Sequence, residues 1–230
     1  MRKLAVLITG TAVIALSAAP ADAALIQYGT RATFNAATAS QQTETFEDAN
    51  FQAGGVACSA PANSSTTSAC FDPGDILPGL QVTTEGAFTG DPQALIIIDN
   101  DAGNGFASGL VFANFFDDIL SLQFAGGVTA VGFDAYHLFD PSPFTISVFG
   151  TSGLLGSFNL NVTDTGAGTF FGVTGTDLIT RITLSSANGM AEGVDNVSFG
   201  TAAVPEPATL LLFGTTVLVA GVRRWRHKRS

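Results

Sequence analysis

Basic side chains are almost missing from the long central part of the chain. The sequence holds 9 Lys and Arg against 19 Asp and Glu, yet Arg31 and Arg181 are the only basic residues between positions 24 and 203. The same stretch keeps every acidic residue except Asp22 and Glu206. Nucleic-acid binding depends on Lys and Arg that neutralise phosphates, so this composition excludes nucleic acid as a partner. The acidic excess favours divalent cations as ligands instead.

Tryptophan, tyrosine and histidine are scarce as well. The chain has 1 Trp, 2 Tyr and 2 His beside 19 Phe. This balance predicts an interior filled with phenylalanine and no strong platform for stacking sugars, because such platforms are usually Trp or Tyr. His137 is the only histidine between positions 24 and 203, and no Gly-x-Ser-x-Gly segment occurs. Both facts argue against a Ser–His–Asp hydrolase.

Cysteine is limited to Cys58 and Cys70, twelve positions apart. The intervening residues Ser59–Ala69 are rich in Ser, Thr, Ala and Asn and show no core-forming pattern. Metal-binding cysteines usually lie closer together and have further partners. In an exported protein such a pair predicts a local disulfide, which contributes about 3 kcal/mol in the chain-entropy model.

The N-terminal segment has the three parts of a secretory signal peptide. Arg2 and Lys3 precede an uncharged, mostly apolar run from Leu4 to Leu16, and residues 21–23 (Ala-Asp-Ala) form a small-residue cleavage site. An N-terminal membrane anchor is the alternative, but the run is too short to cross roughly 30 Å of hydrocarbon. We therefore expect residues 1–23 to be removed before Ala24 and the protein to be exported.

Residues 24–203 consist of short runs rich in Val, Ile, Phe and Thr, separated by Gly, Asn, Asp and Pro. They show no long 3.6-residue apolar period and no repeat of fixed length. Strands are predicted over Thr43–Glu47, Leu80–Thr84, Ala94–Ile98, Ile119–Phe124, Thr129–Ala135, Phe144–Phe149, Leu154–Leu160, Thr169–Val173, Ile179–Ser185 and Val194–Phe199. Strands of this length with frequent turn signals predict an all-β fold, an antiparallel β-sandwich of jelly-roll type.

Two segments of this central part differ from the rest. The Ala-rich composition of Arg31–Ala39 predicts a short surface helix, although its Thr and Asn residues weaken that prediction. Ala53–Gly79 contains both cysteines together with much Gly, Ser and Pro. This composition predicts the longest loop of the domain.

The C-terminal end has three successive parts. Residues 204–207 (Val-Pro-Glu-Pro) end the β-rich part, because proline cannot continue a strand ladder. Ala208–Val222 is uncharged and would be about 22 Å long as a helix, which is short for a membrane span. A basic tail with Arg223, Arg224 and Arg226 follows and would stop translocation. Its physical properties alone predict a weak membrane anchor formed by a short C-terminal transmembrane helix.

This order of parts resembles the PEP-CTERM sorting signal of Gram-negative bacteria, in which a Pro-Glu-Pro motif precedes a short hydrophobic helix and an Arg-rich terminus. The resemblance implies that an exosortase in the inner membrane recognises Pro205, Glu206 and Pro207 and processes the protein on its way to the cell surface. It also implies a setting in which exopolysaccharide is made. A simple membrane tail is the alternative.

The central part resembles the Phe- and Gly-rich domains that often accompany this signal. Such domains end in a strand like Val194–Phe199 and often begin with a Phe-Glu pair, here Phe46 and Glu47. The resemblance implies a sandwich like those of lectins or carbohydrate-binding modules.

The same resemblance implies a structural calcium site. In jelly-roll carbohydrate-binding modules a Ca²⁺ ion often joins an N-terminal Glu to an Asp of the last strand, and Glu47 and Asp195 occupy the analogous positions here. Such hard cations prefer carboxylate and carbonyl oxygens. The turn with Asp99 and Asp101 is the alternative site, although turns rich in Asp and Asn often have no metal.

Taken together, these observations predict a non-enzymatic surface or matrix protein that binds envelope glycans or exopolysaccharide. Tyr136 and His137, with Asp134 and Asp140 beside them, form the one concentrated polar and aromatic cluster and are the candidate ligand contacts. A glycan-active hydrolase is the alternative and would use a carboxylate pair such as Glu47 and Asp134. A purely structural or adhesive surface protein is the second alternative.

Overall fold

The computed structural model describes residues 24–203 without positions 53, 88–89, 100–105, 107, 116–118, 139–141, 163–165, 167 and 187–191. The predicted signal peptide and the sorting segment after Ala203 lie outside these residues, as do Asp101 and Asp140. None of the helical structure in the described part is long and apolar enough to cross a membrane.

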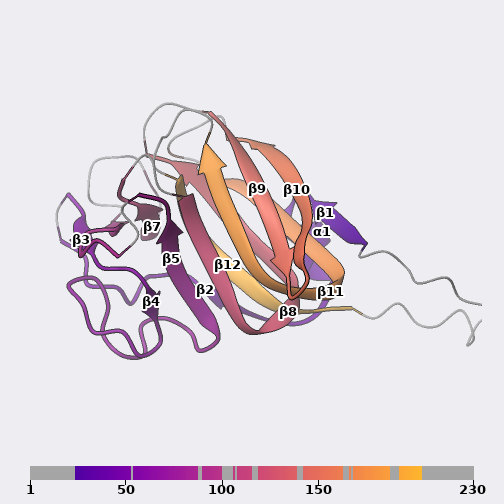
Figure 1. Ribbon diagram of the computed structural model, residues 1–230, viewed down its shortest axis with the longest axis horizontal. Coiled ribbons are helices and arrows are strands. Elements are labelled where there is room, and N and C mark those ends of the chain that lie inside the picture. Colours follow the sequence, from indigo (N-terminus) through magenta and orange to yellow (C-terminus); the bar gives the residue numbers. More distant parts are fainter. Residues whose placement is uncertain are drawn as a thin grey trace, which may run out of the picture.

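The described part is built from antiparallel strands and one short helix, α1 (Arg31–Ala36) (Figure 1). The strands are β1 Leu25–Tyr28, β2 Thr38–Glu44, β3 Val56–Cys58, β4 Ala62–Asn63, β5 Leu80–Glu85, β6 Leu95–Ile98, β7 Leu110–Ala113, β8 Ile119–His137, β9 Pro143–Gly150, β10 Gly153–Asn161, β11 Thr169–Ser186 and β12 Glu192–Ala202. Every pairing among them is antiparallel. The predicted all-β antiparallel fold is therefore confirmed.

Two long strands, β8 and β11, run through both layers of the domain. Residues 119–124 of β8 pair with β5 and with the second half of β11, and β9 and β10 extend this first layer. Residues 130–137 of β8 pair with the first half of β11 and with β12 in the second layer. β1 borders β11 there, whereas β2 and β7 pair with different parts of β12.

The layer change in β8 falls at Gly126 and Gly127. Both residues have φ of 76°, in the left-handed region that favours glycine. The pairing of β11 with β8 shifts between Thr174 and Ile179, opposite this bend. Adjacent bends in β8 and β11 therefore fold one continuous hydrogen-bonded sheet into two layers.

Phenylalanine side chains fill the space between the layers, as the composition predicts. Phe158 of the first layer lies 5.5 Å from Phe171 of the second, measured between ring centroids, and Phe124 lies 5.6 Å from Phe199 in the same way. Phe171 is completely buried. This two-layer core agrees with a β-sandwich, and its assignment to the jelly-roll type stays a prediction.

The sequence placed some elements wrongly. The strand predicted over Thr43–Glu47 is instead β2, which starts at Thr38 and ends at Glu44. Phe46 has φ of 55° and so cannot continue a strand. Four of the predicted strands are halves of β8 and β11, because the glycine-containing bends within these strands resemble turns between separate strands in the sequence. Four short strands, β1, β3, β4 and β7, were not predicted at all.

The predicted helix and disulfide are both present. α1 ends at Ala36, and the Thr30 hydroxyl caps it by accepting a hydrogen bond from the Thr33 N–H. Cys58 and Cys70 form a disulfide with both side chains buried. The Ala53–Gly79 segment is mostly irregular as predicted, but it contains β3 and β4.

Candidate functional site

A polar cluster lies on the outer face of β8 and β12. Asp134 stands on this face because its neighbours in β8, Phe133 and Ala135, point into the core. Arg31 of α1 donates hydrogen bonds to the Asp134 carboxylate at 2.8 Å and to the Ser198 hydroxyl at 3.0 Å. One of the two basic residues of the domain is therefore used to hold α1 against the sheet.

Asp195 lies directly opposite Asp134 in the β8–β12 pairing and is completely buried. Its carboxylate accepts hydrogen bonds from the Ser108 hydroxyl and from the backbone and side-chain N–H groups of Asn196. Burial raises the pKa of Asp195 to about 6; the hydrogen bonds oppose this rise, and the charges of Asp134 and Glu47 add to it. Asp195 is thus a carboxyl group whose ionisation is disfavoured, mainly by burial.

The structure brings Glu47 close to Asp195, as the predicted calcium site requires. The Gly109 N–H donates to Glu47 Oε1 at 3.0 Å, next to Ser108, which binds Asp195. Both carboxylates therefore accept hydrogen bonds from the 108–109 segment.

Glu47 and Asp195 offer carboxylate oxygens, which are the type of ligand that Ca²⁺ prefers. In the described part of the chain, however, no group of three His, Cys, Asp or Glu side chains could hold a metal ion. A Ca²⁺ ion takes about six to eight oxygen ligands, so most would have to come from backbone carbonyls and water. Asp99 follows β6, and its proposed partner Asp101 lies outside the described residues. Calcium binding therefore stays a prediction.

Tyr136 and His137 do not form the predicted ligand site. They belong to β8 rather than to a loop, and adjacent strand residues point to opposite faces. Tyr136 is 7% exposed and packs edge-on against Phe106, with ring centroids 5.8 Å apart. His137 is fully buried against Phe144. Their burial on opposite faces contradicts a shared surface contact with a ligand.

His137 instead faces Glu192 across the β8–β12 pairing, and both side chains are buried. The Ser186 N–H donates to Glu192 Oε1, whereas Glu192 Oε2 and His137 Nδ1 have no hydrogen-bond partner within the described part of the chain. Burial raises the pKa of Glu192 to about 7 and lowers the pKa of His137. This pair is closed to solvent and therefore affects stability rather than binding.

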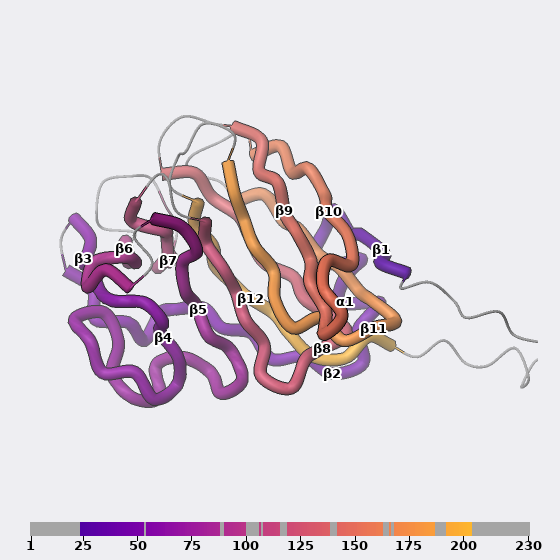
Figure 2. The backbone as a smooth tube through the Cα atoms, in the orientation of Figure 1, coloured from indigo at the N-terminus to yellow at the C-terminus, as the bar shows by residue number. Residues whose placement is uncertain are grey.

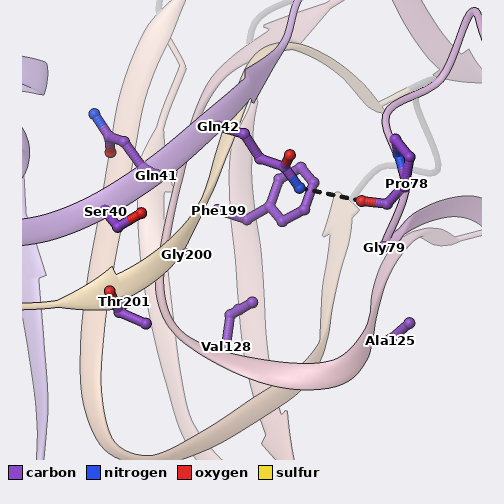
Figure 3. Close-up of a pocket in the computed structure, with 10 residues that line it drawn as sticks. All are labelled: Ser40, Gln41, Gln42, Pro78, Gly79, Ala125, Val128, Phe199, Gly200 and Thr201. Carbon is purple, nitrogen blue, oxygen red and sulfur yellow. Dashed lines mark hydrogen bonds between the residues drawn. The ribbon is translucent and has the colours of Figure 1, made fainter.

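The first open hollow lies between β2, the end of β12 and the turn of β8 (Figure 3). Its volume is about 350 Å³. Gln41 and Gln42 of β2 line one side, with Phe199 of β12 beside them, and Pro78 and Gly79 line the other. The Gln42 amide donates to the Pro78 carbonyl at 3.1 Å, which fixes one end of that side chain.

A second hollow of about 350 Å³ shares Gly79 and Ala125 with the first. The Ala125 N–H donates to the Gly79 carbonyl at 2.9 Å, so these two residues form a ridge between the hollows. Gln81 and Gln123 lie in the second hollow and are joined amide to amide at 2.9 Å.

We refer to the two hollows together as the amide groove. Its lining is free of charged residues; it consists of Ser40, Gln41, Gln42, Asn63, Ser64, Pro78, Gly79, Leu80, Gln81, Gln123, Phe124, Ala125, Val128, Thr180, Phe199, Gly200 and Thr201. Amide and hydroxyl groups both donate and accept hydrogen bonds, as sugar hydroxyls do.

Sequence reasoning missed the amide groove. The consecutive Gln41 and Gln42 were the one available signal, but that segment was predicted to lie before the first strand. Gln81 and Gln123 are 42 positions apart and meet only through the β5–β8 register. Because no local pattern connects such residues, only the pairing of strands reveals the groove.

Comparison with known proteins identifies the C-terminal end. Residues 203–226 match the PEP-CTERM protein-sorting motif, which confirms the resemblance drawn from Pro205, Glu206 and Pro207. This motif indicates an exported protein that is anchored in the membrane and then processed. No curated protein matches the chain.

Solved structures show only distant similarity. The adhesin domain K2 of Lys-gingipain is 14% identical, with a TM-score of 0.42, over 70% of this chain and 99% of that one. A family 29 carbohydrate-binding module is 16% identical, with a TM-score of 0.33, over 68% and 99%. A family 11 carbohydrate-binding module of a Clostridium thermocellum cellulase is 14% identical, with a TM-score of 0.27, over 74% and 99%.

Proposed function

We propose that this protein is a non-enzymatic surface or matrix protein of a Gram-negative bacterium that binds neutral envelope glycans or exopolysaccharide through the amide groove. The observation that carries the binding proposal is the uncharged, amide-rich lining of this groove in a domain that is otherwise strongly acidic. A neutral sugar chain avoids both charge repulsion and the need for basic partners. Without an exposed Trp or Tyr platform, each contact is weak, and binding depends on the length of the polymer.

Delivery to the surface depends on the C-terminal motif. We expect replacement of Pro205, Glu206 and Pro207 by alanine to leave an unprocessed form in the inner membrane, because the processing exosortase recognises these residues. Cell fractionation and immunoblotting of the native host measure this. Normal processing and surface delivery of the variant would show that the motif does not direct sorting.

A glycan-active hydrolase is the second candidate, favoured by one observation. Asp134 and Asp195 face each other, and the pKa of Asp195 is raised to about 6, as acid–base catalysis on glycosides requires of one carboxyl group. Against it, Asp195 is completely buried and Asp134 is occupied by Arg31.

A glycan screen on the processed protein, with and without Ca²⁺, separates these candidates. Binding without turnover supports the proposed function, and release of reducing ends supports the hydrolase. If the protein neither binds nor cleaves any glycan, a structural or adhesive role replaces both.

A further inference from the structure

Three large apolar side chains stand exposed in the described part of the chain. They are Ile26, Leu154 and Leu178, with 57%, 60% and 45% of their surface accessible. A single exposed leucine is ordinary and needs no explanation. These three, however, lie on three different strands that meet at one end of the sandwich, which we call the exit end.

Leu178 lies at the centre of the exit end. A Cβ atom on Gly127 would lie 2.9 Å from Leu178 Cβ, and one on Gly150 would lie 2.8 Å from the Leu178 carbonyl oxygen. The bend of β8 and the β9–β10 turn therefore both abut Leu178. Leu154 pairs with Phe149 directly beside that turn.

The described chain enters and leaves the sandwich at the exit end. The Ala24 N–H donates to the Thr176 hydroxyl at 3.2 Å, and the Thr176 N–H donates to the Ala24 carbonyl at 3.3 Å. Ile26 lines the same hollow as Ala202 and Ala203. Figure 2 shows the start of β1 and the end of β12 on the same side of the molecule, beside β11.

The exit end is also nearly free of charge. It is formed by residues 24–28, 125–128, 150–156, 174–178 and 200–203. Asp177 is the single charged residue in these segments, whereas the whole of residues 24–203 has seventeen carboxylates. Carboxylates are costly to desolvate and are repelled by anionic lipid headgroups. The exit end combines this low charge with the three exposed apolar side chains, and this combination suits contact with a membrane.

Only residues 204–207 separate the exit end from the uncharged stretch Ala208–Val222. Four residues span at most about 14 Å when fully extended. We propose that the exit end rests on the phospholipid bilayer, with Ile26, Leu154 and Leu178 in the headgroup region, for as long as the C-terminal stretch is anchored. This proposal rests on the membrane-anchored state of the proposed function.

The short tether explains why three side chains are enough. A tethered surface has a high effective concentration at the membrane, so weak apolar contacts orient it. After the tether is cut, the same three contacts give only weak, reversible binding. Cleavage of the tether is therefore enough to release the domain from the membrane, and no separate step is needed to detach the exit end.

The test uses the anchored protein without its predicted signal peptide, residues 24–230, in phospholipid vesicles that contain anionic lipid. A bimane label is attached to Leu154→Cys, and the matched control is Asn161→Cys, an exposed residue at the other end of the same strand. Seven residues of strand separate the two labels by about 23 Å. Cys58 and Cys70 do not react because they form a disulfide. Nitroxide lipids quench a label at the membrane, and aqueous iodide quenches a label in water.

We expect the Leu154→Cys label to be quenched several-fold more by nitroxide lipid than the Asn161→Cys label, and iodide to show the reverse order. Cleavage of the tether with a protease should abolish the difference. Equal quenching of both labels in a chain that floats with the vesicles would overturn the orientation while leaving the anchor intact. A chain that does not float with the vesicles would overturn both the orientation and the anchored state.

Discussion

Glu192 of β12 and His137 of β8 are paired across neighbouring strands and buried, and among the described residues each has one polar atom without a hydrogen-bond partner. The folded protein therefore favours the uncharged form of both side chains. For Glu192 the raised pKa makes ionisation a cost to folding, which is absent below its ordinary pKa of 4.5 and complete above about 7. For His137 the lowered pKa works in the opposite direction and costs stability as the pH falls below 6.5.

Substitution of Glu192 by Gln isolates the contribution of the carboxylate, because Gln is neutral at every pH. We expect Glu192→Gln to stabilise the protein by about 3 kcal/mol at pH 8 and to leave its stability unchanged at pH 4. Urea unfolding of the variant and the wild type across this range measures the difference. A difference that does not depend on pH would show that Glu192 is not ionised at a cost in the fold.

Asp195 is the residue on which the calcium prediction depends. It is buried close to the negative charges of Asp134 and Glu47, and a cation would relieve their repulsion. We expect Ca²⁺ to raise the melting temperature by several degrees over EDTA, because a ligand at a hundredfold excess over Kd stabilises by about 2.7 kcal/mol.

The variants Glu47→Ala and Asp195→Ala should both lose this shift. Equal melting temperatures of the wild type in Ca²⁺ and EDTA would rule out a calcium site at Glu47 and Asp195. If Ca²⁺ still raised the melting temperature of both variants, the calcium site would instead be assigned to Asp99 and Asp101.

At the scale of elements, the pairing of β2 with β12 builds the first hollow of the amide groove. Gly200 of β12 lies against β2 so closely that a Cβ atom would be 2.0 Å from the Ser40 carbonyl oxygen. The atoms in the way belong to the backbone, so β2 would have to move.

We expect Gly200→Ala to destabilise the protein by about 1–3 kcal/mol and to displace Gln41 and Gln42. Gly29→Ala is the matched control, because a Cβ atom there would meet nothing within 4 Å. Thermal melting compares the two variants. If both melted like the wild type, β2 would not be packed on β12 as described.

The elements also show which features the sequence could reveal. Alternating apolar residues located the strands that form the core, and the isolated cysteine pair located the disulfide. β1, β3, β4 and β7 have two to four residues each, too few for a period to be visible. The continuity of β8 and β11 was hidden because glycine-rich bends within a strand look the same in sequence as turns between strands.

At the scale of the whole molecule, the sorting signal can be recognised from the sequence, whereas the proposed binding surface cannot. Pro205, Glu206, Pro207 and the basic tail form one contiguous pattern, so their role is visible without a structure. The amide groove combines side chains from β2, β5, β8 and β12, whose contact depends on strand register. The burial of Tyr136 and His137 was equally hidden, because a strand end and a loop have similar composition.

The same scale shows how the domain distributes its charge. The exit end carries one carboxylate and the chain termini of the sandwich, whereas the amide groove carries no charge and most acidic residues lie elsewhere. The acidic remainder of the surface repels negatively charged polymers, including nucleic acid. This distribution of charge supports the proposal that neutral glycans bind in the amide groove.

Affinity electrophoresis of the processed protein tests the central claim most directly, with soluble neutral glucans and galactans as probes and alginate as the anionic counterpart. The variants are Gln42→Ala and Gln123→Ala in the amide groove, with Gln27→Ala, exposed on β1 outside the groove, as the matched control. We predict that a neutral polysaccharide retards the wild type and the Gln27→Ala protein, that each groove variant binds roughly 5-fold more weakly through the loss of about 1 kcal/mol of hydrogen bonding, and that alginate retards none of them. Equal retardation of all four proteins, or retardation by alginate alone, would contradict the account.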